Sequence, residues 1–114
     1  FSYDRAADDI RAAIDSDLRR LRDGLPDARI IVVEPFWYTD DRPASVDVIA
    51  GWVETAADRI GADHIDGASH WLDGHYSTSA DSWMASDGLH PNDTGYAYMA
   101  ERMDAALRAF DPPL

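Results

Sequence analysis

Residues 28–33 place the strongest constraint on how this chain can fold. They end in four consecutive β-branched residues, Ile30 to Val33, with no polar residue between them. Such a continuous run predicts a strand covered on both faces, which is typical of a parallel sheet between helices. The other candidate strand, residues 63–66, is short, and a two-stranded sheet is marginal on its own. The pattern therefore predicts that another polypeptide segment completes the sheet.

Three amphipathic helices are expected around these strands. Apolar side chains at three- and four-residue spacing predict helices over residues 3–23, over about 45–60, and from residue 92 or 93 onward. Gly24 and Gly61 are placed to end the first two helices. The order helix, strand, helix, strand, loop, helix predicts an α/β fold.

Length and charge exclude several classes of protein. The 114 residues suffice for one small domain, and the formal net charge is −12. Such an acidic chain is repelled by phosphate backbones and by anionic lipid, so we expect no nucleic-acid partner. No apolar run reaches the roughly 20 residues that span a bilayer, so no transmembrane segment is expected. The absence of cysteine excludes disulfides, thiolate ligands and cysteine nucleophiles, but it leaves the cellular compartment open.

A polar loop over residues 67–91 ends in the stretch with the most evident chemistry. Asp87 lies three residues before His90, on a turn shaped by Gly88 and Pro91. A histidine with a carboxylate partner can take a proton from a nucleophile, while the carboxylate orients the ring and stabilises its charged form. Catalytic groups of open α/β sheets gather beyond the carboxyl ends of the strands, which is where this loop is expected. Asp87 and His90 are therefore the candidate catalytic residues.

The chain offers no serine in a convincing nucleophile setting. Residues 67–70 begin like a nucleophile elbow around Ser69, but Trp71 stands where the second glycine is needed. We therefore expect the nucleophile to come from another polypeptide segment.

The block of Asp87, His90 and Pro91 followed by a helix resembles the last sequence block of the SGNH (GDSL-type) hydrolase family. Residues 26–35 and 61–66 resemble the family's strands before that block. The resemblance implies a flavodoxin-like three-layer sandwich with a parallel sheet. Residues 1–114 would supply its last two strands and three helices, as the C-terminal half of a single domain.

The same resemblance implies a serine esterase or lipase that cleaves small carboxylic esters through an acyl-serine intermediate. His90 would be the general base and Asp87 its partner. The family's serine, glycine and asparagine blocks do not occur in residues 1–114, so the expected partner is an N-terminal fragment of the same domain. Residues 1–114 alone would then be inactive. The family implies neither a metal nor an organic cofactor.

Apolar side chains near these loops are candidates for substrate binding. Phe36 and Trp37 follow the predicted strand, Trp83 lies in the long loop, and Leu89 lies between the two candidate catalytic residues. They could line a pocket for the acyl part of a substrate. The same side chains could equally serve as packing.

Two alternative functions are left open. The first is a non-catalytic binding or regulatory fragment on a hydrolase scaffold, suggested by the missing serine. The second is a metal-dependent hydrolase that uses the histidine-rich loop. Its candidate ligands are His64, Asp66, His70, Asp73 and His75. Zinc sites usually have tighter histidine spacing, so loop polarity is the simpler interpretation of these residues.

Overall fold

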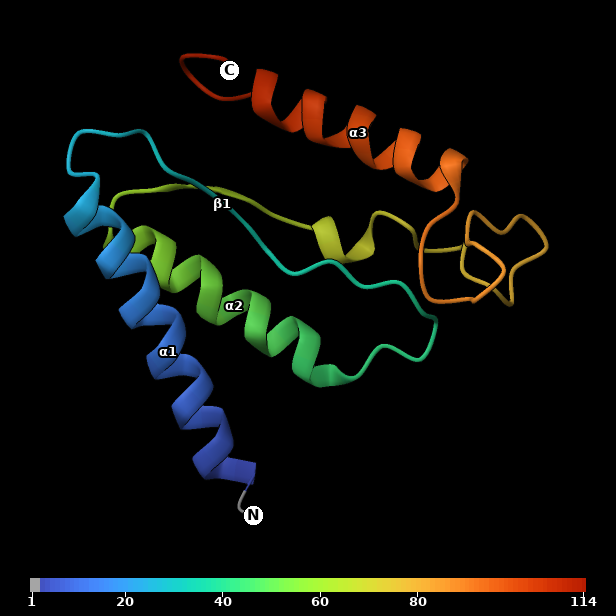
Figure 1. Ribbon diagram of the computed structural model, residues 1–114, viewed down its shortest axis with the longest axis horizontal. Helices are drawn as coiled ribbons and strands as arrows, with labels where there is room; N and C mark the ends of the chain where they lie inside the picture. Colours follow the sequence, from blue (N-terminus) through green and yellow to red (C-terminus); the bar gives the residue numbers. More distant parts are fainter. Residues whose placement is uncertain (1–2) are drawn as a thin grey trace. The chain divides into compact units, whose positions relative to one another are not determined.

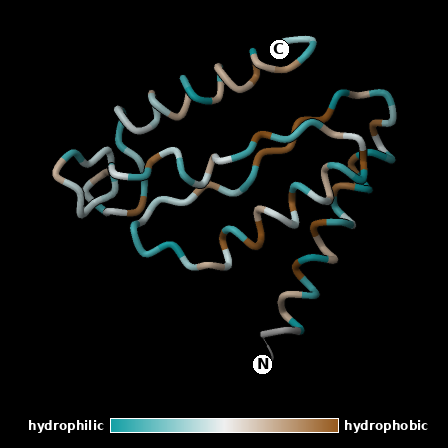
Figure 2. Tube along the Cα trace, turned by 180° about the vertical axis from the view of Figure 1, so that it is seen from behind, coloured by the Kyte–Doolittle hydropathy of each residue, from teal (hydrophilic) through white to brown (hydrophobic). Residues whose placement is uncertain are grey.

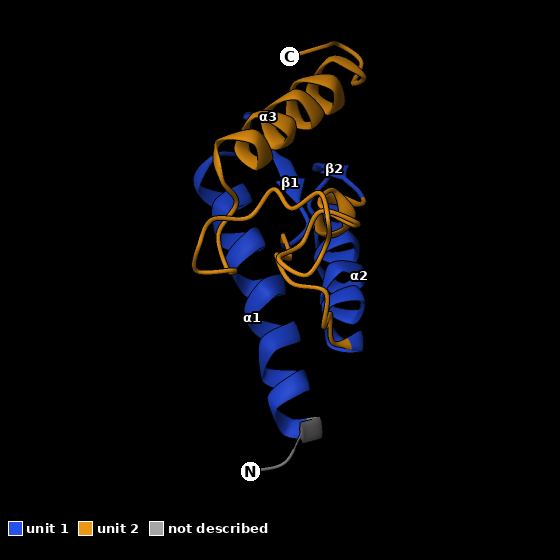
Figure 3. Cartoon of the chain, turned by 90° about the vertical axis from the view of Figure 1, so that its right-hand side faces the viewer, with its two compact units in different colours: residues 1–35, 44–66 blue, residues 36–43, 67–114 orange. Residues whose placement is uncertain are grey.

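The computed structural model describes residues 3–114, with side chains from residue 5 onward. Within this range it contains three α-helices and a small parallel two-stranded sheet, which confirms the α/β prediction. The chain divides into two compact units (Figure 3). Unit 1 comprises residues up to 35 together with 44–66, and unit 2 comprises 36–43 and 67–114.

Unit 1 holds the sheet and two of the helices. Its elements are α1 (Tyr3–Gly24), β1 (Ile31–Val33), α2 (Ala44–Arg59) and β2 (Asp63–Ile65). The strands run parallel, with Ile31 opposite Asp63 and Val33 opposite Ile65. Helix α2 connects the strands and contacts both of them, and α1 contacts α2 (Figure 1). The residues buried in α2 include three alanines, whose small side chains allow close approach of its backbone.

Strand β1 is less covered than its sequence predicts. All three of its residues are half-buried, although the flanking Ile30 and Glu34 are buried. Figure 2 shows brown, hydrophobic stretches along the extended segments that carry the strands. Within the described residues β1 pairs with β2 alone, so its second edge has no strand neighbour there. The apolar side chains of β1 are therefore only partly shielded from solvent.

Arg22 joins the two turns that precede the strands of unit 1. Its Nε donates to the carbonyl of Ile60 at 2.9 Å, and its Nη1 donates to the carbonyl of Ala28 at 2.6 Å. Backbone carbonyls after α1 and after α2 are thus satisfied by a single guanidinium. This contact holds the starts of β1 and β2 next to each other.

Unit 2 contains a short 3₁₀ helix, η1 (Ala68–His70), and the helix α3 (Asp93–Arg108). Its core is formed by Leu72, Tyr76 and Met84. The predicted loop over residues 67–91 is therefore more ordered than its composition suggests, because apolar side chains within it form that core. In the part of the chain that the structure describes, no helix combines the length and apolarity needed to cross a membrane.

Candidate active site

The structure brings Asp87 and His90 into direct contact within unit 2. Nδ1 of His90 lies 2.6 Å from Oδ2 of Asp87. The other carboxylate oxygen, Oδ1, accepts hydrogen bonds from the backbone N–H groups of Leu89 at 2.9 Å and His90 at 3.0 Å. One oxygen is therefore anchored by the backbone, and the other is directed at the imidazole.

The turn that holds this pair depends on Gly88 and on the residues that close the loop. Gly88 has a φ of +69°, which is a left-handed conformation that side chains disfavour. Its N–H donates to the carbonyl of Ala85 at 3.0 Å, and the N–H of Ala85 donates to the carbonyl of His90 at 2.7 Å. An antiparallel bridge between Met84 and Pro91 closes the loop. This local turn thus brings Asp87 and His90, which lie three residues apart in the sequence, into contact.

Helix α3 begins directly after this turn and fixes its far end. Asn92 is the N-cap, and its side chain accepts a hydrogen bond from the N–H of Gly95 at 3.0 Å. The N–H of Asn92 donates to the carbonyl of Trp83 at 2.8 Å. Gly95 packs so closely that a Cβ there would lie 2.6 Å from the carbonyl oxygen of Trp83. The turn at residues 87–90 is therefore held between a strand-like segment and a helix start.

Hydrogen bonding keeps the Asp87 carboxylate charged. The imidazole of His90, followed by the two backbone N–H groups, lowers the pKa of Asp87 to about 2. A charged carboxylate on Nδ1 favours the tautomer in which Nδ1 carries the proton and Nε2 is free to accept one. Among the described residues no hydrogen bond reaches Nε2, and the side chain of His90 is 66% exposed. The pair can therefore act as a base toward a group outside the described residues.

Two of the predicted substrate-binding residues line one depression. Trp37 and Leu89, together with Tyr38 and Thr39, surround a volume of about 180 Å³ within unit 2. The side chain of Leu89, next to this charged pair in the sequence, is 58% exposed. Thr39 was missed by the sequence analysis, because a single threonine in a polar loop carries no periodic signal.

The other two predicted residues lie in aromatic packing contacts. The ring of Phe36 lies 5.7 Å from that of Trp71, measured between centroids. The ring of Trp83 stacks on His75 at 3.5 Å and meets Tyr98 at 4.8 Å. Neither Phe36 nor Trp83 lines the depression around Leu89. Their role in substrate binding stays a prediction.

A network centred on Arg42 joins the two chain segments of unit 2. Its Nη2 donates to Oδ1 of Asp73 at 2.6 Å, to the carbonyl of Ser69 at 2.7 Å and to the hydroxyl of Tyr76 at 3.0 Å. The Tyr76 hydroxyl donates to Asp73 at 2.8 Å, and Nδ1 of His70 lies 2.9 Å from the second oxygen of Asp73. Sequence analysis missed this network, since an arginine 31 residues from its carboxylate partner gives no local signal.

The network opposes deprotonation of Tyr76. Burial and the neighbouring Asp73 carboxylate raise the pKa of Tyr76 to about 12. Burial alone would raise the pKa of Asp73, but hydrogen bonds from Arg42, His70 and Tyr76 hold it below its usual value. The protonated phenol therefore favours the folded state fully below pH 10, and this contribution is lost as the pH rises toward 12.

We expect the ultraviolet difference spectrum between the wild type and Tyr76→Phe to show one phenol titrating near pH 12. Asp73→Asn removes the negative charge and one hydrogen bond, so it should move this titration toward pH 10. A Tyr76 phenol that titrates near pH 10 in the wild-type protein would contradict the network.

The candidate metal ligands are divided between the two units. His64 and Asp66 belong to unit 1, where their ligand atoms lie within 4.8 Å of Glu54. His70 and His75 belong to unit 2, and each contacts a different carboxylate. Of the five candidate ligands, the structure therefore brings only His64 and Asp66 into one group, together with Glu54, among the residues that it describes.

Comparisons with known proteins identify the family. A model described as the GDSL-like Lipase/Acylhydrolase family matches residues 1–98. The chain is 33% identical over 88 residues to a protein named GDSL lipase Rv0518 from Mycobacterium tuberculosis. That alignment covers 76% of this chain and 35% of the relative, so the chain spans about a third of the length of the relative. No solved structure is significantly similar to this chain. Because the family model covers most of its residues, the chain belongs to the GDSL-like lipase/acylhydrolase family.

Proposed function

We propose that this chain carries the general base, His90, and its orienting partner, Asp87, of a serine ester hydrolase. The observation that supports this most directly is the 2.6 Å contact between Nδ1 of His90 and a carboxylate that two backbone N–H groups hold in place. Membership of a lipase and acylhydrolase family agrees with this chemistry. The side chain of His90 is 66% exposed, so a group outside the described residues can reach its ring.

In the proposed reaction a serine oxygen attacks the carbonyl carbon of the ester while Nε2 of His90 takes the hydroxyl proton. The tetrahedral intermediate expels the alcohol, which receives that proton from His90. Water then attacks the acyl-serine, again assisted by His90, and releases the acid. Asp87 remains charged throughout and stabilises the imidazolium that forms in each half of the cycle.

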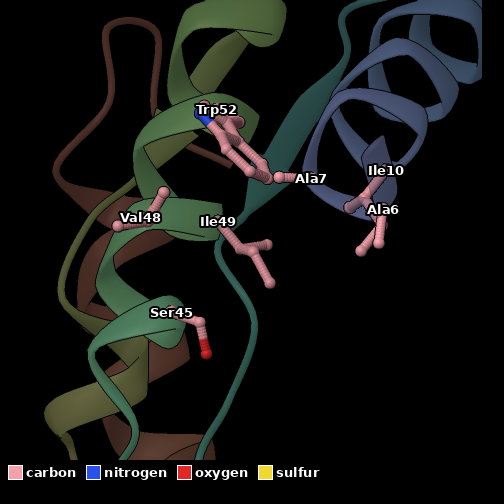
Figure 4. A pocket seen from close by; sticks show the side chains of 7 residues that line it. All are labelled: Ala6, Ala7, Ile10, Ser45, Val48, Ile49 and Trp52. Atoms are coloured by element: carbon pink, nitrogen blue, oxygen red, sulfur yellow. The ribbon is translucent and has the colours of Figure 1, made fainter. Parts of the chain in front are cut away.

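We further propose that the serine and the glycine and asparagine blocks come from an N-terminal segment of the same domain. Residues 1–114 would then be its C-terminal half. The half-buried residues of β1 and its unpaired edge in the described chain support this proposal. So does an open apolar groove of about 230 Å³ in unit 1. Figure 4 shows Trp52 of α2 directed toward Ala7 of α1 in this groove, with Ile49 beside it.

The substrate-binding proposal covers Phe36, Trp37, Trp83 and Leu89. Trp37 and Leu89 are supported by the depression that they share next to the catalytic turn. Phe36 and Trp83 are proposed in the same role on residue type alone, since their rings already pack against other aromatic rings. The substrate class is a small carboxylic ester.

The test uses the full-length protein and residues 1–114 side by side. We expect the full-length protein to hydrolyse p-nitrophenyl butyrate and to be labelled on a serine by a fluorophosphonate. Residues 1–114 alone should show neither reaction above background, because they lack the nucleophile. A full-length protein that neither turns over the ester nor reacts with the probe supports the non-catalytic alternative. Labelling within residues 1–114 would overturn the assignment of the serine to another segment.

A further inference from the structure

We propose that Arg42 is a positioning residue for the reaction of His90, because it holds the part of the long loop that supports the turn at residues 87–90. This inference rests on the proposed function, since it concerns catalysis only if His90 is the base. Arg42 lies in the segment 36–43, which belongs to unit 2 although the rest of that unit begins at residue 67. Its role is to fix the geometry of the turn and not to contact the reacting atoms.

The guanidinium of Arg42 fixes the first part of the loop. The side chain is 18% exposed, and Nη2 lies within 3.0 Å of acceptors on Ser69, Asp73 and Tyr76. The Tyr76 hydroxyl in turn donates to Asp73, so one cation holds a closed set of polar groups. Because the cation is largely shielded from water, its removal leaves these groups without a partner of equal strength. This part of the loop is therefore attached to the segment that carries Arg42.

A second contact between the same two segments lies next to the first. The hydroxyl of Thr78 donates to a carboxylate oxygen of Asp40. The backbone between the two attachment points forms a turn, in which the N–H of Ser79 donates to the carbonyl of Tyr76 at 2.9 Å. The loop is thus attached to the distant segment on both sides of Ser77.

Ser77 lies against the turn that holds Asp87 and His90. A Cβ at Gly88 would lie 3.4 Å from Cβ of Ser77 and 3.5 Å from its Oγ, so little space separates the Ser77 side chain from the backbone of this turn. Gly88 has the greatest conformational freedom in the turn, because it has no side chain. The neighbouring Ser77 limits this freedom, and it does so only while its own position is fixed.

The core of unit 2 connects Arg42 to the other end of the turn. Tyr76 belongs to the same buried cluster as Met84, and Met84 forms the antiparallel bridge with Pro91. Pro91 directly follows His90 in the sequence. The hydroxyl of Tyr76 is held by Arg42, so a change at Arg42 would also displace the phenol ring within this core.

Small displacements of the turn are expected to have large effects on the reaction. A misplacement of about 1 Å caused by a distant substitution can lower a rate about 10²-fold. His90 has to present Nε2 to the serine while Nδ1 keeps its 2.6 Å contact with Asp87. If the turn opens, the carboxylate no longer holds the ring in the tautomer with the proton on Nδ1.

The experiment compares full-length Arg42→Gln and Arg42→Lys with the wild type. Fluorophosphonate labelling carried to completion counts the folded active sites, and kcat for p-nitrophenyl butyrate is expressed per labelled site. We expect Arg42→Gln to lower kcat per site about 10²-fold. Arg42→Lys keeps the positive charge but not the planar group, so its kcat should lie between those of Arg42→Gln and the wild type.

Nitrogen NMR of the neutral His90 ring provides a readout that a merely structural role of Arg42 would not change. The wild type should show the tautomer with the proton on Nδ1, and folded Arg42→Gln should show a mixture of both tautomers. Asp73→Asn keeps the shape of its side chain and carries the test if Arg42→Gln does not fold. It should lower kcat per site about tenfold, since it removes a charged hydrogen-bond partner of Arg42.

The matched control is Arg59→Gln. Arg59 also binds an aspartate that is distant in the sequence, with Nη1 lying 3.0 Å from both carboxylate oxygens of Asp15, but this pair lies in unit 1. Its kcat per site should stay within about twofold of the wild type, and the His90 tautomer should be unchanged.

The outcomes separate the inference from the proposed function. If Arg42→Gln leaves kcat per labelled site unchanged, the network serves folding alone, and the inference is overturned while the hydrolase assignment stands. A lowered kcat with an unchanged His90 tautomer also overturns it, as does an equal loss in Arg59→Gln. If Arg42→Gln does not fold, wild-type kcat in Asp73→Asn overturns it. Absence of both turnover and labelling in the wild type overturns the proposed function itself.

Discussion

Replacing His90 by alanine in the full-length protein is expected to lower kcat for p-nitrophenyl butyrate by about 10⁴-fold or more. Without the imidazole, no group takes the serine proton or returns it to the leaving alcohol. KM should change little, since His90 is not among the residues that line the depression around Leu89. The thermal unfolding midpoint should also change little, because the side chain of His90 is 66% exposed. Steady-state kinetics and thermal denaturation of the same preparation provide the check.

Asp87→Asn is expected to lower kcat by about 10³- to 10⁴-fold, although the replacement has the same shape. An amide can still accept a hydrogen bond, but it cannot stabilise a positively charged imidazole. Because the pKa of Asp87 is lowered to about 2, the carboxylate form is lost only as the pH falls through that value. Protonation of Asp87 should therefore not limit the reaction above pH 4.

The control for this pair is Asp81→Asn. Asp81 also contacts a histidine, with Oδ2 lying 3.3 Å from Nδ1 of His75, and its side chain is 75% exposed. If the catalytic effect belongs to the turn at residues 87–90, Asp81→Asn should retain activity within about twofold. Near wild-type turnover by both His90→Ala and Asp87→Asn would rule out the proposed base.

The second large effect is expected at Gly95, and it concerns stability. Gly95→Ala would place a Cβ 2.6 Å from the carbonyl oxygen of Trp83 and 2.9 Å from Cβ of Pro91. Neither the backbone carbonyl nor the proline ring can move away without shifting the turn that holds Asp87 and His90. We expect a loss of about 3 kcal/mol in the free energy of unfolding, measured by urea denaturation, and reduced kcat in the folded fraction.

Gly51→Ala is the matched control, because Gly51 is also helical but has no atom within 4 Å of the added Cβ. Alanine favours a helix over glycine by about 0.5–1 kcal/mol, so this variant should be slightly more stable than the wild type. A lower free energy of unfolding for Gly95→Ala, together with a higher one for Gly51→Ala, would confirm that close packing and not helix propensity requires glycine at position 95. Equal stability of both variants would contradict the close approach of Trp83.

Local patterns were sufficient to predict the elements and the contact between Asp87 and His90. Helix α1 was expected over residues 3–23 and occupies Tyr3–Gly24, and α2 was expected over about 45–60 and occupies Ala44–Arg59. The family resemblance drawn from the block around His90 is confirmed by the family match. Asp87 and His90 were identified together because three residues and a glycine turn suffice to bring them into contact. A contact between residues this close in the sequence depends only on the local turn, which the types of the neighbouring residues indicate.

Contacts between distant residues were decided only by the tertiary structure. Nothing in the sequence indicated that Arg42 would bind Asp73, or that Trp37 would share a depression with Leu89. Hydrophobic periodicity predicts which face of a helix or strand a residue occupies, but not which distant residue it contacts. A contact between distant residues closes a long loop, and its formation depends on the other contacts of the fold. The sequence by itself determined the elements and the contact between Asp87 and His90, because both depend on neighbouring residues. The tertiary structure alone decided which distant side chains lie together, as Arg42 and Asp73 do, because such contacts depend on how the whole chain folds.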